Sequence, residues 1–150
     1  MMLPSKIMSS YTWYQTLIKP FWAPPSWLFG PVWTVLYAII AITFGTVFYK
    51  AFAGKIPWIV ALPFALNLLF NFAFTPIQFG LKNNLLASVD IILVLGTLVW
   101  ALVALYSFGL KLHIETGAPT YAWIIYANIP YLLWVLFATI LQITITKLNY

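Results

Sequence analysis

Long apolar stretches alternate with short polar ones along most of this chain. A helix needs about 20 residues to cross the hydrocarbon core of a bilayer, and four stretches are long enough, at about residues 27–49, 57–80, 85–110 and 120–146. Lipid offers the backbone no hydrogen bonds, so each stretch is expected to be helical. The short connections between them favour an up-and-down arrangement. We therefore predict an all-α integral membrane protein, with residues 1–150 forming one transmembrane domain, an up-and-down bundle of four clear helices.

Composition supports a lipid environment. The 150 residues are 64% hydrophobic and only 6% charged, whereas soluble domains carry roughly 25% charged residues. The net charge of +5 comes from lysines dispersed at the ends of the apolar stretches, with no arginine. Without a basic patch or bidentate phosphate donors, nucleic-acid binding is not expected. We therefore expect an integral, multi-pass membrane protein.

Prolines and polar residues mark the expected boundaries. Pro24-Pro25 favour extended backbone, so the first helix is predicted to start near Ser26 with Pro31 in its first turn. Trp and Tyr residues precede it, and residues 11–21 are predicted to form an interfacial turn or short helix.

Inside the spans, Pro63, Pro76 and Pro130 predict kinks. The polar stretch Lys111–Pro119 is predicted to be a loop, with His113 exposed to solvent.

Two helix faces combine small residues with aromatic ones at three- and four-residue spacing. The first face holds Gly30, Trp33, Tyr37, Ala41 and Phe44, and the second holds Tyr131, Trp134, Ala138 and Gln142. A glycine beside large rings leaves a notch with flat walls, which suits a planar, hydrophobic ligand. Packing between helices explains such stripes equally well, so both interpretations stay open.

Polar side chains inside the spans also allow two interpretations. One face of the second span carries Asn67, Asn71, Thr75 and Gln78. These side chains either hydrogen-bond between helices or line a ligand pocket. Asp90 is the one carboxylate near a span, and an acid inside a membrane is a candidate functional residue. The simpler interpretation is an acid favoured at a helix start or a hydrogen-bonded structural residue.

The residue types favour binding or transport over catalysis. The chain has no cysteine, one histidine and two separated acids, too few ligands for a metal site. No nucleophile–base pair or carboxylate pair suits acid–base catalysis. One alternative is a small four-helix exporter of hydrophobic compounds that couples transport to protons through Asp90.

The residues before and inside the first span resemble a known family signature. The matching positions are Trp13-Tyr14, Lys19-Pro20, Trp22, Pro24-Pro25, Trp27, Gly30-Pro31-Val32-Trp33-Thr34 and Leu36-Tyr37. Asn71–Gly80, Asp90 and the stretch Pro130–Trp134 match later parts of the signature. This pattern is similar to the TspO/MBR family, the tryptophan-rich sensory proteins and mitochondrial translocator proteins.

The resemblance implies a membrane receptor or sensor, with a regulatory or transport role, that binds protoporphyrin IX-type tetrapyrroles and other hydrophobic ligands. It implies a homodimer in the lipid bilayer of a bacterial or archaeal plasma membrane, with porphyrin as a ligand rather than a cofactor. Light- and oxygen-dependent porphyrin breakdown, with Trp33 and Trp134 involved, is a weaker implication. Mapped onto the faces above, the expected ligand-binding residues are Trp27, Gly30, Trp33, Tyr37, Asn67, Asn71, Phe74, Asp90, Tyr131, Trp134 and Ala138.

Two departures from the family pattern change the expectation. Family members have five spanning helices, and only 12 residues precede Trp13 here, so we expect the first helix to be absent or truncated. Phe74 stands where the family has a tryptophan, which removes one indole N–H from the expected pocket.

Overall fold

The computed structural model describes residues 17–24 and 26–149, and these fold almost entirely into helices. The elements are η1 (Ser26–Leu28), α2 (Phe29–Phe52), α3 (Trp58–Thr75), η2 (Pro76–Gly80), α4 (Asn84–Thr116), α5 (Ala122–Ala127) and α6 (Ile129–Leu148). The helices α2, α3, α4 and α6 are long and apolar enough to span a membrane. The predicted all-α membrane bundle with four spanning helices is therefore confirmed, and a short fifth helix, α5, joins it.

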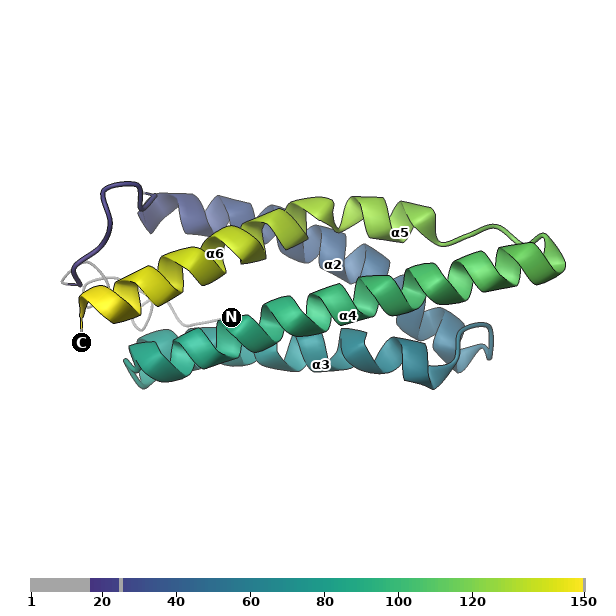
Figure 1. Cartoon of the computed structure of the whole chain (residues 1–150), viewed down its shortest axis with the longest axis horizontal. Coiled ribbons are helices and arrows are strands. Elements are labelled where there is room, and N and C mark those ends of the chain that lie inside the picture. The colour runs from purple at the N-terminus through teal and green to yellow at the C-terminus, as the bar shows by residue number, and fades with distance from the viewer. Residues whose placement is uncertain (1–16, 25, 150) are drawn as a thin grey trace.

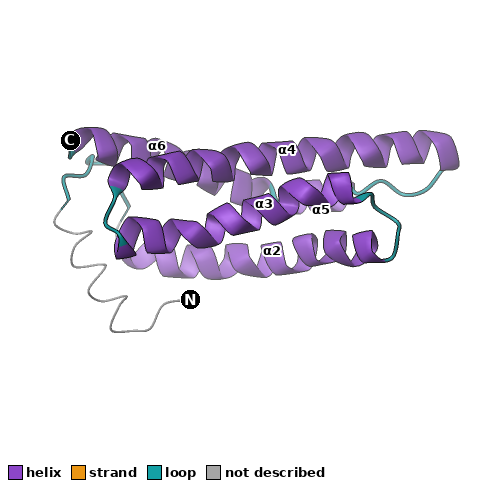
Figure 2. Ribbon diagram, turned by 90° about the horizontal axis from the view of Figure 1, so that it is seen from below, coloured by secondary structure: helices purple, strands orange, loops and turns teal. Residues whose placement is uncertain are grey.

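The long helices lie side by side along one axis, and each runs opposite to the next along the chain (Figures 1 and 2). The central helix α4 packs along much of α3 and α6, whereas α2 contacts α3 and α5 over shorter stretches. α5 leads into α6 and continues nearly along its line (Figure 1). The core between the helices includes the fully buried side chains of Phe44, Phe64, Leu98 and Tyr131.

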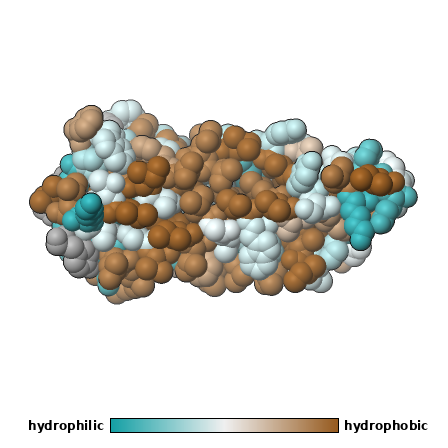
Figure 3. All heavy atoms as spheres, viewed as in Figure 1, coloured by the Kyte–Doolittle hydropathy of each residue, from teal (hydrophilic) through white to brown (hydrophobic). Residues whose placement is uncertain are grey.

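The outer surface suits lipid. Many large apolar side chains are exposed along the spans, such as Ile42, Leu69 and Val103, and hydrophobic residues cover the middle of the face seen in Figure 3. α4 has 33 residues, about 50 Å of helix, which exceeds a hydrocarbon core of about 30 Å. Its last turns carry Lys111, His113 and Glu115, all exposed, at the end where hydrophilic residues gather (Figure 3).

The predicted loop over Lys111–Pro119 is wrong, because α4 continues as far as Thr116. Backbone bonds within a helix are satisfied in water as well as in lipid, so polar residues alone do not end it. Gly117 ends it, with a φ of 73° and an N–H that donates to the carbonyl of His113 at 2.8 Å. His113 therefore lies on the last turn of α4, and its Nδ1 is 2.7 Å from the carbonyl oxygen of Ala118.

The helix starts and breaks differ in detail from the prediction. The first span begins with the short helix η1 and becomes α-helical at Phe29. The fourth span is interrupted at Asn128, and Pro130 lies in the first turn of α6, where its missing N–H breaks no helical bond. Pro76 opens the π-helical turn η2, while α3 continues through Pro63. Of the predicted interfacial segment, residues 11–16 lie outside the described part, and residues 17–21 are not helical.

Candidate functional site

A buried hydrogen-bond network joins four helices in the centre of the bundle. The hydroxyl of Tyr131 (α6) donates to Asn67 Oδ1 (α3) at 2.8 Å and accepts from Asn71 Nδ2 (α3) at 2.6 Å. Tyr37 (α2) donates to Asn71 Oδ1 at 3.1 Å, and Asn67 Nδ2 donates to Thr97 Oγ1 (α4) at 3.2 Å. The two asparagines and Tyr131 are almost fully buried. Their polar groups therefore connect helices, which is one of the two roles expected for asparagines inside a span.

Trp33 packs against this network. Its ring lies 5.4 Å from the ring of Tyr37 and meets Tyr131 edge-on at 6.5 Å, measured between centroids. The structure thus brings together five of the expected site residues, Trp33, Tyr37, Asn67, Asn71 and Tyr131. They form a packed, polar-centred cluster.

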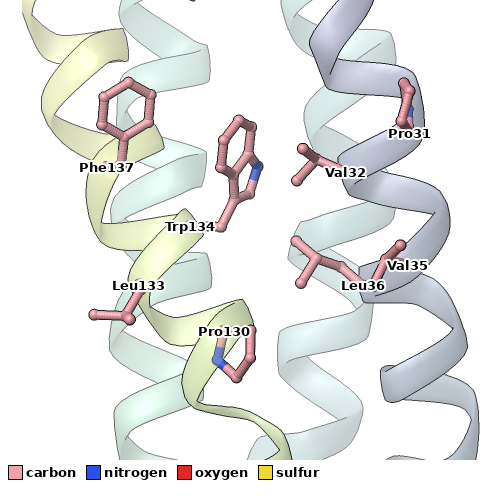
Figure 4. Close-up of a pocket in the computed structure, with 8 residues that line it drawn as sticks. All are labelled: Pro31, Val32, Val35, Leu36, Pro130, Leu133, Trp134 and Phe137. Carbon is pink, nitrogen blue, oxygen red and sulfur yellow. The ribbon is translucent and has the colours of Figure 1, made fainter.

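An apolar pocket of about 560 Å³ lies beside this cluster, between α2 and α6 (Figure 4). Its lining residues are Pro31, Val32, Val35, Leu36, Pro130, Leu133, Trp134 and Phe137. Val32 and Leu36 point from α2 towards α6, and Trp134 points from α6 towards α2 (Figure 4). Of the expected ligand-binding residues, Trp134 lines this pocket and Trp33 does not.

Trp134 is the lining residue whose side chain carries a polar group. Its Nε1 is buried and has no hydrogen-bond partner among the described residues. The indole ring is held by an edge-on contact with Phe29 at 5.8 Å and by Phe137 at 5.6 Å. A buried N–H without a partner is costly, but this atom has almost no accessible surface, so a ligand in the pocket meets the apolar part of the ring and reaches the N–H only after neighbouring side chains move.

The chain before α2 packs next to one end of this pocket. Trp22 meets the pocket residue Phe137 edge-on at 5.8 Å between ring centroids. Leu17 and Ala23 pack around Leu141 and Ile145, two buried residues in the C-terminal half of α6. The side chain of Asn149 fixes this segment, because it accepts from the Ile18 N–H at 3.1 Å and donates to the Ile18 carbonyl at 2.9 Å.

Lys19 belongs to the same segment and lies outside the spans. Its ammonium donates to the carbonyl of Leu17 at 3.2 Å. Partial burial lowers the pKa of Lys19 below its ordinary value, because the charged form loses solvation.

The remaining expected site residues do not line the pocket. Trp27 is 71% exposed, and a Cβ added at the exposed Gly30 would meet no atom within 4 Å. Phe74 and Ala138 are half-buried against the core. Asp90 is buried inside the bundle, and its Oδ2 has no hydrogen-bond partner among the residues that the structure describes.

Sequence reasoning missed most of the pocket's lining. The α2 residues Val32, Val35 and Leu36 recur at three- and four-residue spacing, as Leu133, Trp134 and Phe137 do on α6. This spacing was the available signal, but aliphatic residues in a membrane span look alike whether they face lipid or a pocket. Within the described ranges, no three His, Cys, Asp or Glu side chains come together to hold a metal ion.

Comparison with known proteins agrees with this architecture. The TspO/MBR family model matches residues 2–148. The chain is 38% identical over 139 residues to the tryptophan-rich protein TspO of Bacillus cereus, covering 92% of this chain and 81% of that protein. It is 33% identical over 141 residues to the translocator protein of Homo sapiens, covering 92% and 75%, respectively.

A third relative is named as a sensory protein. The tryptophan-rich sensory protein of Cereibacter sphaeroides is 32% identical over 139 residues, with 92% of this chain and 77% of that protein covered. The family match extends over nearly the whole chain, and the bundle has four helices suited to a membrane. The chain is therefore an integral, multi-pass membrane protein that belongs to the TspO/MBR family.

Proposed function

We propose that this chain is a membrane receptor or sensor that binds planar hydrophobic ligands of the protoporphyrin IX type. The proposed site is the pocket between α2 and α6, with the indole of Trp134 as its aromatic wall. The observation that carries the proposal is the apolar pocket of about 560 Å³ with the rings of Trp134 and Phe137 in its lining.

The size and chemistry of the pocket support such a ligand. Pockets for small molecules usually measure about 300–1,000 Å³ and combine apolar walls with a few polar groups, and this one measures about 560 Å³. A tetrapyrrole offers a flat apolar face for the Trp134 ring and carboxylate oxygens that accept hydrogen bonds. The accessible lining is apolar because the Trp134 N–H is buried, so the flat face of the ligand should make most of the contact.

The names of the relatives support a sensory or transport role. They include a sensory protein and a translocator protein, and we extend these roles to this chain as part of the proposal. The homodimer implied by the family resemblance belongs to the same proposal.

Titration with protoporphyrin IX in detergent tests the proposed site, with the change in porphyrin absorbance as the readout. Trp134→Ala should weaken binding by about tenfold or more, because truncating a buried aromatic anchor typically costs over about 1.4 kcal/mol. Trp123→Ala is the matched control, since Trp123 on α5 is 49% exposed and does not line the pocket. Equal affinities for Trp134→Ala and the parent protein would show that the pocket is assigned wrongly.

The burial of Asp90 favours a second candidate function, proton-coupled export of hydrophobic compounds. A carboxylate oxygen without a described partner inside a bundle is unusual, and such acids often carry protons. Transport into proteoliposomes separates the two functions. Asp90→Asn should abolish transport if the exporter function is correct, and should leave porphyrin binding intact if the protein acts only as a receptor.

A further inference from the structure

We propose that hydrophobic ligands reach the pocket sideways from the bilayer, through the gap between α2 and α6 that Val35 and Leu133 flank. This inference rests on the proposed function and adds the route by which the ligand arrives. It also restricts the ligand class, because only molecules that dissolve among lipid acyl chains can take this route.

The first argument is that the pocket is open on its outer side. Val35 on α2 and Leu133 on α6 are each 60% exposed, although both belong to its lining. Val32, Leu36 and Trp134 project into the gap between the two helices (Figure 4). A ligand can thus reach the Trp134 ring between the exposed side chains of Val35 and Leu133, without passing through the buried core.

The second argument is the depth of the opening. Phe137 precedes Lys147 by ten residues, about 15 Å along α6, and Pro31 precedes Lys50 by 19 residues, about 28 Å along α2. Lysines near the ends of spans reach towards the two membrane–water interfaces, which lie outside the hydrocarbon core. The pocket lies between these two levels, so its open side faces acyl chains.

The third argument is that apolar packing covers the end of the pocket nearest the chain termini. Trp22 lies against Phe137, and Phe29 lies against Trp134, each edge-on at 5.8 Å. The segment that carries Trp22 is fastened to Asn149 by two hydrogen bonds. A ligand arriving from water on this side would have to displace these contacts, whereas the side facing lipid requires no such change.

A reversible cross-link across the gap tests the route. The chain has no cysteine, so Val35→Cys and Leu133→Cys together can be joined by a reducible bifunctional thiol reagent that spans the open side. The control pair is Ile42→Cys and Tyr126→Cys, seven residues further along α2 and seven residues earlier on the antiparallel α5–α6 line, so the two sites again face each other across the bundle. Ile42 and Tyr126 are 64% and 73% exposed and do not line the pocket.

The measurement is the rate at which each protein, in nanodiscs, takes up protoporphyrin IX from loaded lipid vesicles, together with the equilibrium affinity before cross-linking. Cross-linking Val35→Cys/Leu133→Cys should slow uptake by about tenfold or more, within the one to three decades typical of association-rate changes. Reduction should restore the rate, and the control pair should be unaffected.

Two results would overturn the inference, and they are distinguishable. If the proteins bind porphyrin but the cross-linked Val35/Leu133 pair takes it up at the rate of the control, the lateral route is wrong and the proposed function stands. If no protein binds porphyrin before cross-linking, the proposed function fails and the inference fails with it.

Discussion

The hydroxyl of Tyr131 donates a 2.8 Å hydrogen bond to Asn67, a residue on another spanning helix and 64 positions away in the chain. The same oxygen accepts from Asn71 at 2.6 Å, and Asn67 and Tyr131 have no exposed surface. The hydrogen-bonding groups of these three side chains thus pair with one another inside the bundle, where they have neither water nor a lipid headgroup as a partner. This relationship fixes the rotation of α6 relative to α3, and so determines which face of α6 turns towards α2.

Tyr131→Phe should destabilise the bundle. The substitution keeps the ring but leaves the Oδ1 of Asn67 and the Nδ2 of Asn71 without the hydroxyl. An unsatisfied buried group costs about 1–3 kcal/mol, while hydrogen bonds measured inside one membrane bundle average about 0.6 kcal/mol. We therefore expect a loss of about 1–2 kcal/mol, measured as a lower unfolding temperature in detergent.

The matched control for this prediction is Tyr126→Phe. Tyr126 lies on α5 and is 73% exposed, so removing its hydroxyl should leave the unfolding temperature nearly unchanged. Equal stability of the two variants would mean that the network contributes nothing to the fold.

Trp134→Phe should weaken porphyrin binding more than Trp33→Phe. The first change replaces the aromatic wall of the pocket by a smaller ring, whereas Trp33 packs on Tyr37 and Tyr131 away from the lining. The lost apolar contact should cost about 0.5–1.5 kcal/mol, roughly a two- to tenfold change in affinity. Porphyrin titrations of both variants give the comparison, and a larger loss for Trp33→Phe would move the site to the Tyr131 cluster.

The sequence predicts the spans well because length and hydropathy decide them. It also predicts that Asn67 and Asn71 turn inwards, since uncompensated amides do not face hydrocarbon. It does not predict which aromatic residue meets the pocket. Successive residues are about 100° apart around a helix, so Val32 and Trp33 on α2 face different neighbours, and only the packing of the whole bundle determines which neighbour lies where.

The end of α4 is predicted less well, because hydropathy reports the membrane boundary and not the helix boundary. Lys111 and Glu115 suggested a loop because charged residues leave the membrane, but leaving the membrane does not require leaving the helix. The signal that ends α4 was present in Gly117, whose φ of 73° suits glycine. The polar character of the preceding residues indicates where the chain leaves the membrane, whereas Gly117 indicates where the helix ends.

Gly117→Ala should destabilise the end of α4. Alanine in a left-handed conformation costs roughly 1 kcal/mol, and the affected N–H caps the helix by donating to His113. Gly96→Ala on the same helix is the control. An added Cβ there meets no atom within 4 Å, and alanine in a helix interior is favoured over glycine by about 0.5–1 kcal/mol. The unfolding temperature should therefore fall for Gly117→Ala and rise for Gly96→Ala. If both variants shift in the same direction, the assignment of Gly117 as the cap is contradicted.

Asn149→Ala should release the segment that precedes α2 while leaving the bundle folded. The substitution removes both hydrogen bonds to Ile18, and the segment then depends on the packing of Leu17, Trp22 and Ala23. We expect faster amide hydrogen exchange over residues 17–23, because the Ile18 N–H loses its acceptor. Exchange in the middle of α4 should not change.

Asn149→Asp tests more sharply whether the two hydrogen bonds of Asn149 hold this segment in place. It keeps an acceptor for the Ile18 N–H but loses the donor to the Ile18 carbonyl, so protection at Ile18 should be intermediate between the parent protein and Asn149→Ala. If the alanine variant exchanges as slowly as the parent, packing of Trp22 against Phe137 is sufficient to hold the segment, and the side chain of Asn149 is not what fastens it over the end of the pocket.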